Sequence, residues 1–240
     1  SIIQDLDINI VSAYYHLYDK KVPLKDRKMK LFYGIAKLEE QLQIEGIGDK
    51  KIWLSPHSFS RVNYSNSQII YQKIWDVCSR LSGEGSYKYV MFGRDLYYPL
   101  KILLNLPRKV GFFGITHCPI TYRDVIEDKE NQMGTVCQFV EKSQYVDEIS
   151  QHIHKDNQFG EVKYVFVLTA GRNGLGKKLC QMLVEFRSSV KKIIYIGCNR
   201  ENMNKDLSLL IGSEKYQIES SYISNEFSLT DYNNNILVLG

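Results

Sequence analysis

Apolar and polar positions alternate in two different rhythms along the chain from about residue 55 onward. Between residues 65 and 81, Ile70, Ile74, Val77, Cys78 and Leu81 recur at helical spacing, which predicts an amphipathic helix. Short apolar runs predict strands at 87–93, 109–115, 135–141, 162–169, 191–197, 216–223 and 234–240. Further helices are predicted at 143–155, 175–189 and 201–211, and another that starts at or near Pro99.

Repeated strand–helix units predict an α/β fold with a mostly parallel sheet covered by helices on both faces. The last two strands, 216–223 and 234–240, have no helical period between them, so we expect an antiparallel pair at the end of the chain. The charged segment 23–46 is interpreted as an amphipathic helix or helix pair, followed by a strand at 50–56. We therefore divide the chain into a small leading segment, 1–54, and a main domain, 55–240.

Composition narrows the classes of function only slightly. The formal charge of +4 permits a nucleic-acid partner without requiring one. Five scattered cysteines, with no C-x-x-C pair, argue against a disulfide framework or a zinc site and favour a reducing compartment. The pair His152 and His154 lacks partners at ligand spacing, so no metal is expected. No apolar run reaches the roughly 20 residues that span a bilayer.

Cys198 follows the predicted strand 191–197 at the edge where open parallel sheets bind ligands. Asn199 is well placed to cap the next helix, and a thiol near a helix N-terminus has its thiolate stabilised by the helix dipole. That placement suits a nucleophile. A small buried residue in a strand-to-helix turn is the alternative interpretation of a lone cysteine.

The segment 195–210, YIGCNRENMNKDLSLL, resembles the nucleophile segment of the S-adenosylmethionine-dependent RNA uracil-C5 methyltransferases, which typically reads Val-Ser-Cys-Asn-Pro followed by an Arg-Asp-Leu helix. The segment 55–74 resembles their Ser-Phe-Phe-Gln-x-Asn motif and keeps Ser58, Phe59 and Asn63. The segment 168–179 is similar to their Asp-Pro-Pro-Arg-x-Gly-Leu loop and keeps Arg172, Gly174 and Leu175. The resemblance covers roughly residues 52–240. It implies a Rossmann-like class I methyltransferase fold, with Cys198 adding to C6 of a uracil ring.

Departures from the family pattern fall on the positions that would hold the methyl donor. Where the family has a glycine-rich turn, only Gly93 remains, and Arg94, Asp95, Leu96 and Tyr97 bring bulky side chains. The acid expected to hold the ribose corresponds to Gly114. The glutamine of the Ser-Phe-Phe-Gln motif has become Arg61, a cation that would face the positive sulfonium.

The positions that would bind and deprotonate the uracil depart from the family pattern as well. The family's loop acid corresponds to Thr169, and its proton-abstracting glutamate aligns with Asn234. An amide cannot take a proton at neutral pH, so general-base catalysis would fail at Asn234. Asp231 is a nearby carboxylate, but it precedes the expected position by three residues, more than a one- or two-residue misalignment would shift it. Taken together, these losses predict that Cys198 is inherited and idle, that the cofactor positions Arg61, Gly93, Gly114 and Thr169 are degenerate, and that no cofactor binds.

Basic residues are predicted to contact RNA phosphates if they converge in space, although a solvated surface is an equally good interpretation. These residues are Arg172, Lys177, Lys178, Lys191, Lys192 and Arg200.

The sequence thus predicts a non-catalytic, methyltransferase-like pseudoenzyme that serves as a structural or RNA-binding component of a ribonucleoprotein. A ribosome or its assembly intermediate is the expected setting, with rRNA and other proteins as partners, in the mitochondrial matrix or the cytoplasm. The alternative is an active S-adenosylmethionine-dependent uridine-C5 methyltransferase with a divergent cofactor site. A protein-interaction subunit that never touches RNA is a third hypothesis.

Overall fold

The computed structural model describes residues 12–15, 30–61, 63–107, 109–128, 135–158, 160–224 and 233–240. Its helices are α1 (Tyr64–Glu84), α2 (Tyr97–Leu103), α3 (Pro119–Glu127), α4 (Tyr145–Asn157), α5 (Lys177–Glu185) and α6 (Arg200–Ile211). Its strands are β1 (Ser12–Tyr15), β2 (Lys30–Gly34), β3 (Leu38–Ile44), β4 (Gly48–Leu54), β5 (Tyr87–Gly93), β6 (Lys109–Thr116), β7 (Thr135–Phe139), β8 (Tyr164–Gly171), β9 (Val190–Gly197), β10 (Ile218–Ser224) and β11 (Asn234–Leu239).

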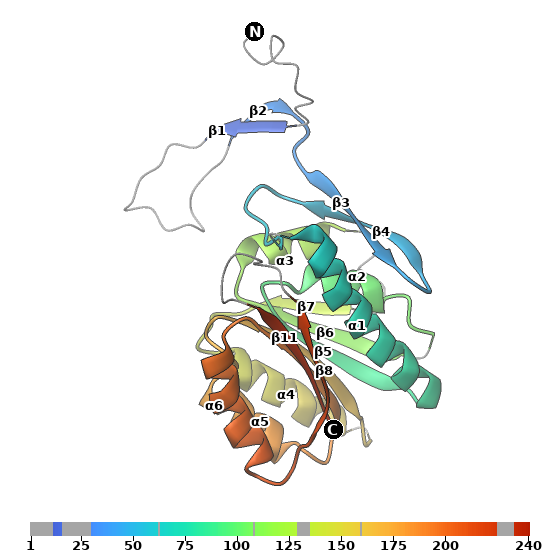
Figure 1. The fold of residues 1–240 in the computed structure, drawn as a ribbon, viewed down its shortest axis with the longest axis vertical. Helices are drawn as coiled ribbons and strands as arrows, with labels where there is room; N and C mark the ends of the chain where they lie inside the picture. Colours follow the sequence, from blue (N-terminus) through green and yellow to red (C-terminus); the bar gives the residue numbers. More distant parts are fainter. Residues whose placement is uncertain are drawn as a thin grey trace.

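The central sheet has seven strands in the order β10-β11-β9-β8-β5-β6-β7 (Figure 1). Strands β5 to β9 run parallel, whereas β11 pairs antiparallel with β9 and β10 antiparallel with β11. The chain first builds outward from β5 to β7 and then returns to place β8 on the other side of β5. The predicted α/β fold and antiparallel end are confirmed, and the carboxyl ends of β5 and β8 form the switch point where such sheets bind ligands.

Helices cover both faces of this sheet. One apolar core joins buried residues of α1 and α2 to β5 and β6, and a second joins α4, α5 and α6 to β8 and β9. In Figure 1, α1, α2 and α3 lie on one side of the sheet and α4, α5 and α6 on the other. The strands are buried on both faces, which explains their nearly continuous apolar sequences.

The helix predicted at 23–46 is wrong wherever the structure describes that segment. Residues 38–44 form β3, which pairs antiparallel with β4, and residues 30–34 form β2. Leu42 and Ile44 alternate with exposed residues, a strand period that the high charge of the segment concealed. The β3–β4 hairpin packs its apolar side onto α1 and α2. The division between 54 and 55 stays a prediction.

Two smaller differences concern helices. Helix α3 was not predicted, although Pro119 at its first turn is a helix-start signal. Helix α2 begins at Tyr97, two residues before the proline that was taken as its start. Within the described residues, no helix is long and apolar enough to cross a membrane.

Candidate functional site

A cavity of about 860 Å³ opens at the carboxyl ends of the parallel strands. It begins at the tips of β5 and β6, passes the end of β8 and reaches the end of β9 and the start of β11. Its walls include Phe59, Ser60, Arg61, Phe92, Arg94, Asp95, His117, Lys142, Tyr145, the loop 169–176, Ile196, Gly197, Cys198 and Asn234. The volume lies within the ~300–1,000 Å³ of typical ligand sites.

Cys198 lies in this cavity, half-buried, where β9 turns into α6. Asn199 caps α6 as predicted, because its side chain accepts a hydrogen bond of 2.9 Å from the backbone N–H of Asn202. Gly197 pairs with Asn235 of the antiparallel strand β11, so Asn234, which is 4% exposed, also lines the Cys198 end. Cys198 and Asn234 therefore lie at the same end of the cavity, and the alignment of Asn234 with the family's base stays a prediction.

A buried carboxylate fixes the loop opposite Cys198. Asp206 of α6 accepts hydrogen bonds from the backbone N–H groups of Leu175 (2.7 Å) and Gly176 (3.1 Å) and from the hydroxyl of Tyr195 (2.6 Å). The loop approaches Asp206 closely at Gly174, where φ is +70° and an added Cβ would lie 2.5 Å from the carboxylate. Asp206 thus ties the loop before α5 to the helix after Cys198.

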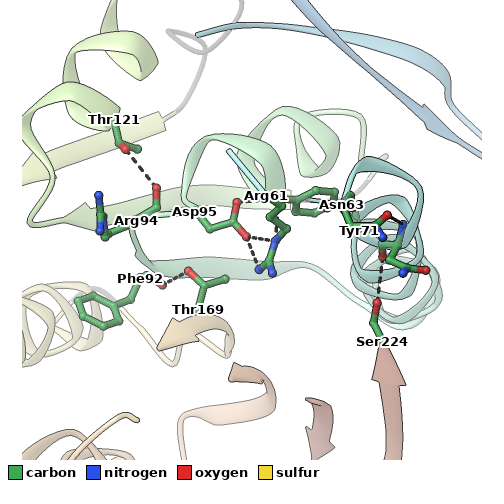
Figure 2. Close-up of polar contacts among 11 residues, drawn as sticks. Arg61, Asn63, Tyr71, Phe92, Arg94, Asp95, Thr121, Thr169 and Ser224 are labelled. Atoms are coloured by element: carbon green, nitrogen blue, oxygen red, sulfur yellow. Dashed lines mark hydrogen bonds and ion pairs between the residues drawn. The ribbon is translucent and has the colours of Figure 1, made fainter. Parts of the chain in front are cut away.

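The end of β5 presses against the end of β8. Gly93 has φ of +133°, and a Cβ there would lie 2.0 Å from Oγ1 of Thr169. That hydroxyl donates to the carbonyl of Phe92 at 3.0 Å (Figure 2). Thr169, interpreted from the sequence as a lost acid, therefore contacts the strand tip at the switch point, and Gly93 is required for the close approach.

Arg61 does not present an isolated cation to the cavity. Its Nη2 lies 2.5 Å and its Nε 2.9 Å from Oδ2 of Asp95, and Tyr71 donates to Oδ1 at 2.7 Å (Figure 2). The side chains of Arg61 and Asp95 are 7% and 3% exposed. Burial and the nearby Asp95 raise the pKa of Tyr71 well above its usual range. Because the pair carries no net charge, the repulsion expected between Arg61 and a sulfonium does not follow.

Leu96 and Tyr97, two of the bulky residues after Gly93, do not line the cavity. Leu96 and Tyr97 are 1% and 2% exposed and belong to the apolar core on the α1 and α2 side. Leu96 packs over Gly114, where an added Cβ would lie 3.0 Å from Cδ1 of the leucine. Gly114 is inside β6, paired with Met91 of β5, rather than at the tip of the strand. The residue that follows β6 and lines the cavity is His117.

His117, Lys142, Phe92 and Tyr145 are site residues that the sequence did not single out. Phe92 and Tyr145 stack with ring centroids 4.4 Å apart and form an aromatic wall. Nδ1 of His117 is buried and, among the described residues, has no hydrogen-bond partner. Burial, followed by the charges of Arg94 and Lys142, lowers the pKa of His117 below its usual value. The predicted order of strands could have identified these four residues, because each lies at or just beyond the carboxyl end of a parallel strand, where such sheets bind ligands.

The predicted RNA contacts divide between two edges of the sheet. Arg172, Lys177, Lys178 and Arg200 lie in or next to the loops at the carboxyl edge. Lys191 and Lys192 lie at the start of β9, at the opposite edge, where Lys192 forms an ion pair with Glu219. These six residues do not converge on one site, and of the six only Arg172 lines the cavity that contains Cys198.

The two histidines of the His-x-His pair contact aromatic rings. His152 stacks on Phe113 with centroids 3.7 Å apart, and His154 meets the edge of Phe186 at 5.0 Å. Among the described residues, no group of three His, Cys, Asp or Glu side chains is arranged to hold a metal ion.

Comparison with known proteins finds relatives that are named as methyltransferases. The chain is 25% identical over 197 residues to the 23S rRNA (uracil(747)-C(5))-methyltransferase RlmC of Escherichia coli O157:H7 (strain EC4115 / EHEC), and 24% identical to RlmC of Shigella boydii serotype 18. Each match covers 80% of the chain and 46% of the relative, so the chain spans about half the length of these curated relatives. No family model matches.

Solved structures agree on the architecture. Trm5b from Pyrococcus abyssi superposes with a TM-score of 0.53 at 14% identity, covering 97% of this chain and 65% of Trm5b. SMU.776, solved in complex with SAH, superposes with a TM-score of 0.53 at 9% identity, covering 88% of this chain and 59% of the other. The fold is that of Rossmann-like methyltransferases.

These comparisons contradict the prediction of a non-catalytic pseudoenzyme. The relatives similar in sequence are named as rRNA methyltransferases, and a protein with the same fold holds SAH, so the prediction that no cofactor binds is also wrong. Part of the physical reason lies in the cavity: of the side chains expected to block it, Arg61 is paired with Asp95, and Leu96 and Tyr97 are buried in the core. The matched relatives are bacterial, which gives the predicted mitochondrial setting no support, and no finding supports a ribosomal role.

Proposed function

We propose that this chain is the catalytic part of an S-adenosylmethionine-dependent RNA methyltransferase that modifies C5 of uridine, with rRNA as its substrate class. The observation that carries the proposal is the placement of Cys198 and Asn234 in a cavity of about 860 Å³ at the carboxyl edge of a methyltransferase-type sheet. Similarity to RlmC over 80% of the chain supports the choice of uracil C5.

The cavity residues fit the methyl donor. Bound S-adenosylmethionine supplies an electrophilic methyl group. The stacked rings of Phe92 and Tyr145 offer an apolar wall for its base, and the orphaned Nδ1 of His117 can exchange a hydrogen bond with its hydroxyls. Asp95, held by Arg61 and Tyr71, is the carboxylate among the described cavity residues.

Cys198 is the residue assigned to activate the uracil. Its thiolate, favoured by the N-terminal end of α6, forms a bond from sulfur to C6, and the electrons of the C5–C6 double bond shift toward C5 and the O4 carbonyl. C5 would take the methyl group from bound S-adenosylmethionine, which would leave as S-adenosylhomocysteine. The C5 proton then passes to solvent water, and the C5–C6 double bond forms again as the carbon–sulfur bond breaks and the thiolate is released.

The acceptor of the C5 proton is not Asn234, because an amide is not basic at neutral pH. His117 is not placed for the task either. Strands β8 and β5 separate the tip of β6 from the tip of β9, and three strand spacings of ~4.8 Å put about 14 Å between them. Asp231, the carboxylate noted in the sequence, lies outside the described residues.

The proposal is tested with rRNA that carries tritium at C5 of uridine. Addition of the chain and S-adenosylmethionine should release one tritium into water for each methyl group that enters the RNA, and the Cys198→Ala variant should release none. Methylation without tritium release would exclude C5 as the target. Absence of both, in a sample shown by circular dichroism to be folded, would contradict the proposed activity.

A further inference from the structure

The chain enters one wall of the cavity through a tight turn, residues 55–58, which read Ser-Pro-His-Ser. The backbone N–H of Ser58 donates to the carbonyl of Ser55 at 2.8 Å, the bond that closes a β-turn. Proline at the second position favours this turn, because its φ is already close to the value that the position needs. The three residues that follow, 59–61, line the cavity, so the turn sets where they lie.

A buried carboxylate on helix α3 holds both ends of this turn. Oδ2 of Asp124 accepts a hydrogen bond of 2.9 Å from the backbone N–H of Ser55, and Oδ1 accepts one of 2.5 Å from the hydroxyl of the same residue. The hydroxyl of Ser58 also donates to Oδ2. Asp124 is 1% exposed, and Nζ of Lys37 lies 3.1 Å from Oδ1, so the buried charge is paired. Four contacts therefore meet on one side chain and tie the turn to α3.

The same helix holds the neighbouring part of the wall. Thr121 lies three residues before Asp124, on the same face of α3, and its hydroxyl donates to the carbonyl of Arg94 at 3.1 Å (Figure 2). Arg94 follows β5, and its guanidinium lies 5.8 Å from the ring centroid of Phe59, the first residue after the turn. Helix α3 thus holds both of the segments that meet at Phe59.

We propose that Asp124 is a positioning residue for the methyl donor. It acts through the turn on Arg61, whose ion pair with Asp95 holds a carboxylate at the cavity. Asp124 itself is not among the residues that line the cavity, so its effect on the donor is indirect. The inference rests on the proposed function, which supplies the donor as the ligand, and it gives a role to a helix that the sequence did not predict.

Calorimetric titration with S-adenosylhomocysteine, the product of the donor, tests this role. Asp124→Ala removes the acceptor of one backbone N–H and two hydroxyls of the turn. S-adenosylhomocysteine should then bind about tenfold to a hundredfold less tightly, the order of loss that follows a shift of ~1 Å at a site. Asp124→Asn retains one acceptor oxygen, so its affinity should lie between those of the parent and of Asp124→Ala, and it carries the test if Asp124→Ala does not fold.

The matched control is Asp156→Ala on α4. Asp156 accepts hydrogen bonds from Lys88 at 2.7 Å and from Tyr164 at 2.8 Å, at the amino ends of β5 and β8 and so at the edge opposite the cavity. Its loss should lower the stability of the fold in urea, as the loss of Asp124 should, and leave the affinity for S-adenosylhomocysteine unchanged. Equal loss of affinity in both variants, or parental affinity in Asp124→Ala, would overturn the positioning role.

Hydrogen exchange measured by mass spectrometry tests the contact with the turn in the absence of ligand. Residues 55–61 should exchange faster in Asp124→Asn than in the parent, and Asp156→Ala should leave their exchange unchanged. Adding Ser58→Ala to Asp124→Asn should weaken S-adenosylhomocysteine binding little further, because both changes act on one contact. Unchanged exchange at 55–61, or fully additive losses of affinity, would overturn the route through the turn.

Tritium release from rRNA separates this inference from the proposed function. A parent that binds S-adenosylhomocysteine but releases no tritium would contradict the proposed activity, while the difference between the Asp124 and Asp156 variants would still support the positioning role. A parent that releases tritium, with Asp124→Ala equal to the parent in S-adenosylhomocysteine affinity, would overturn the positioning role alone.

Discussion

At the Cys198 end of the cavity, the carboxylate of Asp206 accepts hydrogen bonds from two backbone N–H groups and from the hydroxyl of Tyr195. These bonds hold the loop before α5, strand β9 and helix α6 together. At the Arg94 end, a buried Arg61–Asp95 pair lies beneath a rim of exposed cations. The first end keeps the nucleophile segment around Cys198, although Thr169 and Asn234 depart from the family pattern there. The second end keeps Phe59 but departs from the pattern at the residues that would hold the methyl donor.

The comparison teaches that a lost motif is not a blocked site. Arg61 replaces a neutral glutamine of the family pattern, but Asp95 neutralises it, and both residues come from segments that depart from that pattern. Leu96 is bulky, but Gly114 leaves the space into which it packs. These two departures are each paired with a second one, so the cavity persists at this end although the individual residues have changed.

Removing the nucleophile should have the largest effect. The Cys198→Ala variant should lose both methyl transfer and the covalent adduct with 5-fluorouridine-containing RNA, since no sulfur remains to add to C6. Denaturing electrophoresis of the protein–RNA adduct measures this. The control is Cys137→Ala on β7, where burial raises the pKa of the thiol to about 12. An adduct of undiminished yield in the Cys198→Ala variant would assign the chemistry to another residue.

Breaking the Arg61–Asp95 ion pair at the Arg94 end of the cavity should lower the stability of the fold. Asp95→Ala leaves the buried guanidinium of Arg61 without this carboxylate, and we expect about 3–5 kcal/mol of destabilisation in urea unfolding. The double variant Arg61→Met with Asp95→Leu should recover most of that loss, because an apolar pair replaces the charged one. If the double variant is as unstable as Asp95→Ala, the carboxylate acts through contacts other than Arg61.

Releasing the loop at the Cys198 end should lower activity and stability together. Asp206→Ala removes three acceptor contacts, and about 2–3 kcal/mol of stability should be lost, with kcat falling roughly tenfold while KM for RNA changes less. Asp206→Asn retains one acceptor oxygen, so its stability and its kcat should lie between those of the parent and those of Asp206→Ala. Lys205→Ala, an exposed neighbour on α6, serves as the control. A kcat equal to that of the parent would show that Asp206 has no positioning role.

The smallest effect concerns the pH dependence of stability. Burial and two nearby cations lower the pKa of His117, so the folded state binds its proton less readily than the unfolded state. The stability that His117 contributes is complete above its usual pKa of ~6.5 and is lost as the pH falls through the lower folded value. His117→Gln should therefore unfold with a shallower loss of stability between about pH 7 and pH 5. An equal loss in both proteins would contradict the burial of its Nδ1.

The fold was predictable from the sequence because buried parallel strands are continuous apolar runs, and the helices between them keep a clear period. The Cys198 corner was predictable as well, since Asn199 signals a helix cap directly after a strand. The β3–β4 hairpin was missed because the polar residues Glu39, Glu40, Gln41 and Gln43 of β3 hid the alternation of Leu42 and Ile44.

Whether the cavity is open or blocked could not be predicted from residues taken one at a time. The pairing of Arg61 with Asp95 joins residues 34 positions apart, and the packing of Leu96 on Gly114 depends on the register of β5 and β6. Sequence reasoning counted each change as a loss, whereas the structure shows changes that compensate one another. His117 was overlooked because the ribose-binding position was aligned with Gly114, which lies inside β6, three residues before His117.

Isothermal titration calorimetry with S-adenosylmethionine tests the central claim most directly, because a usable cavity must bind the methyl donor without RNA. We predict one site per chain with a dissociation constant of about 1–100 μM, within the range typical of enzymes and their substrates. A folded sample that gives no binding heat at millimolar concentrations of the donor, and no competition with S-adenosylhomocysteine, would contradict the account.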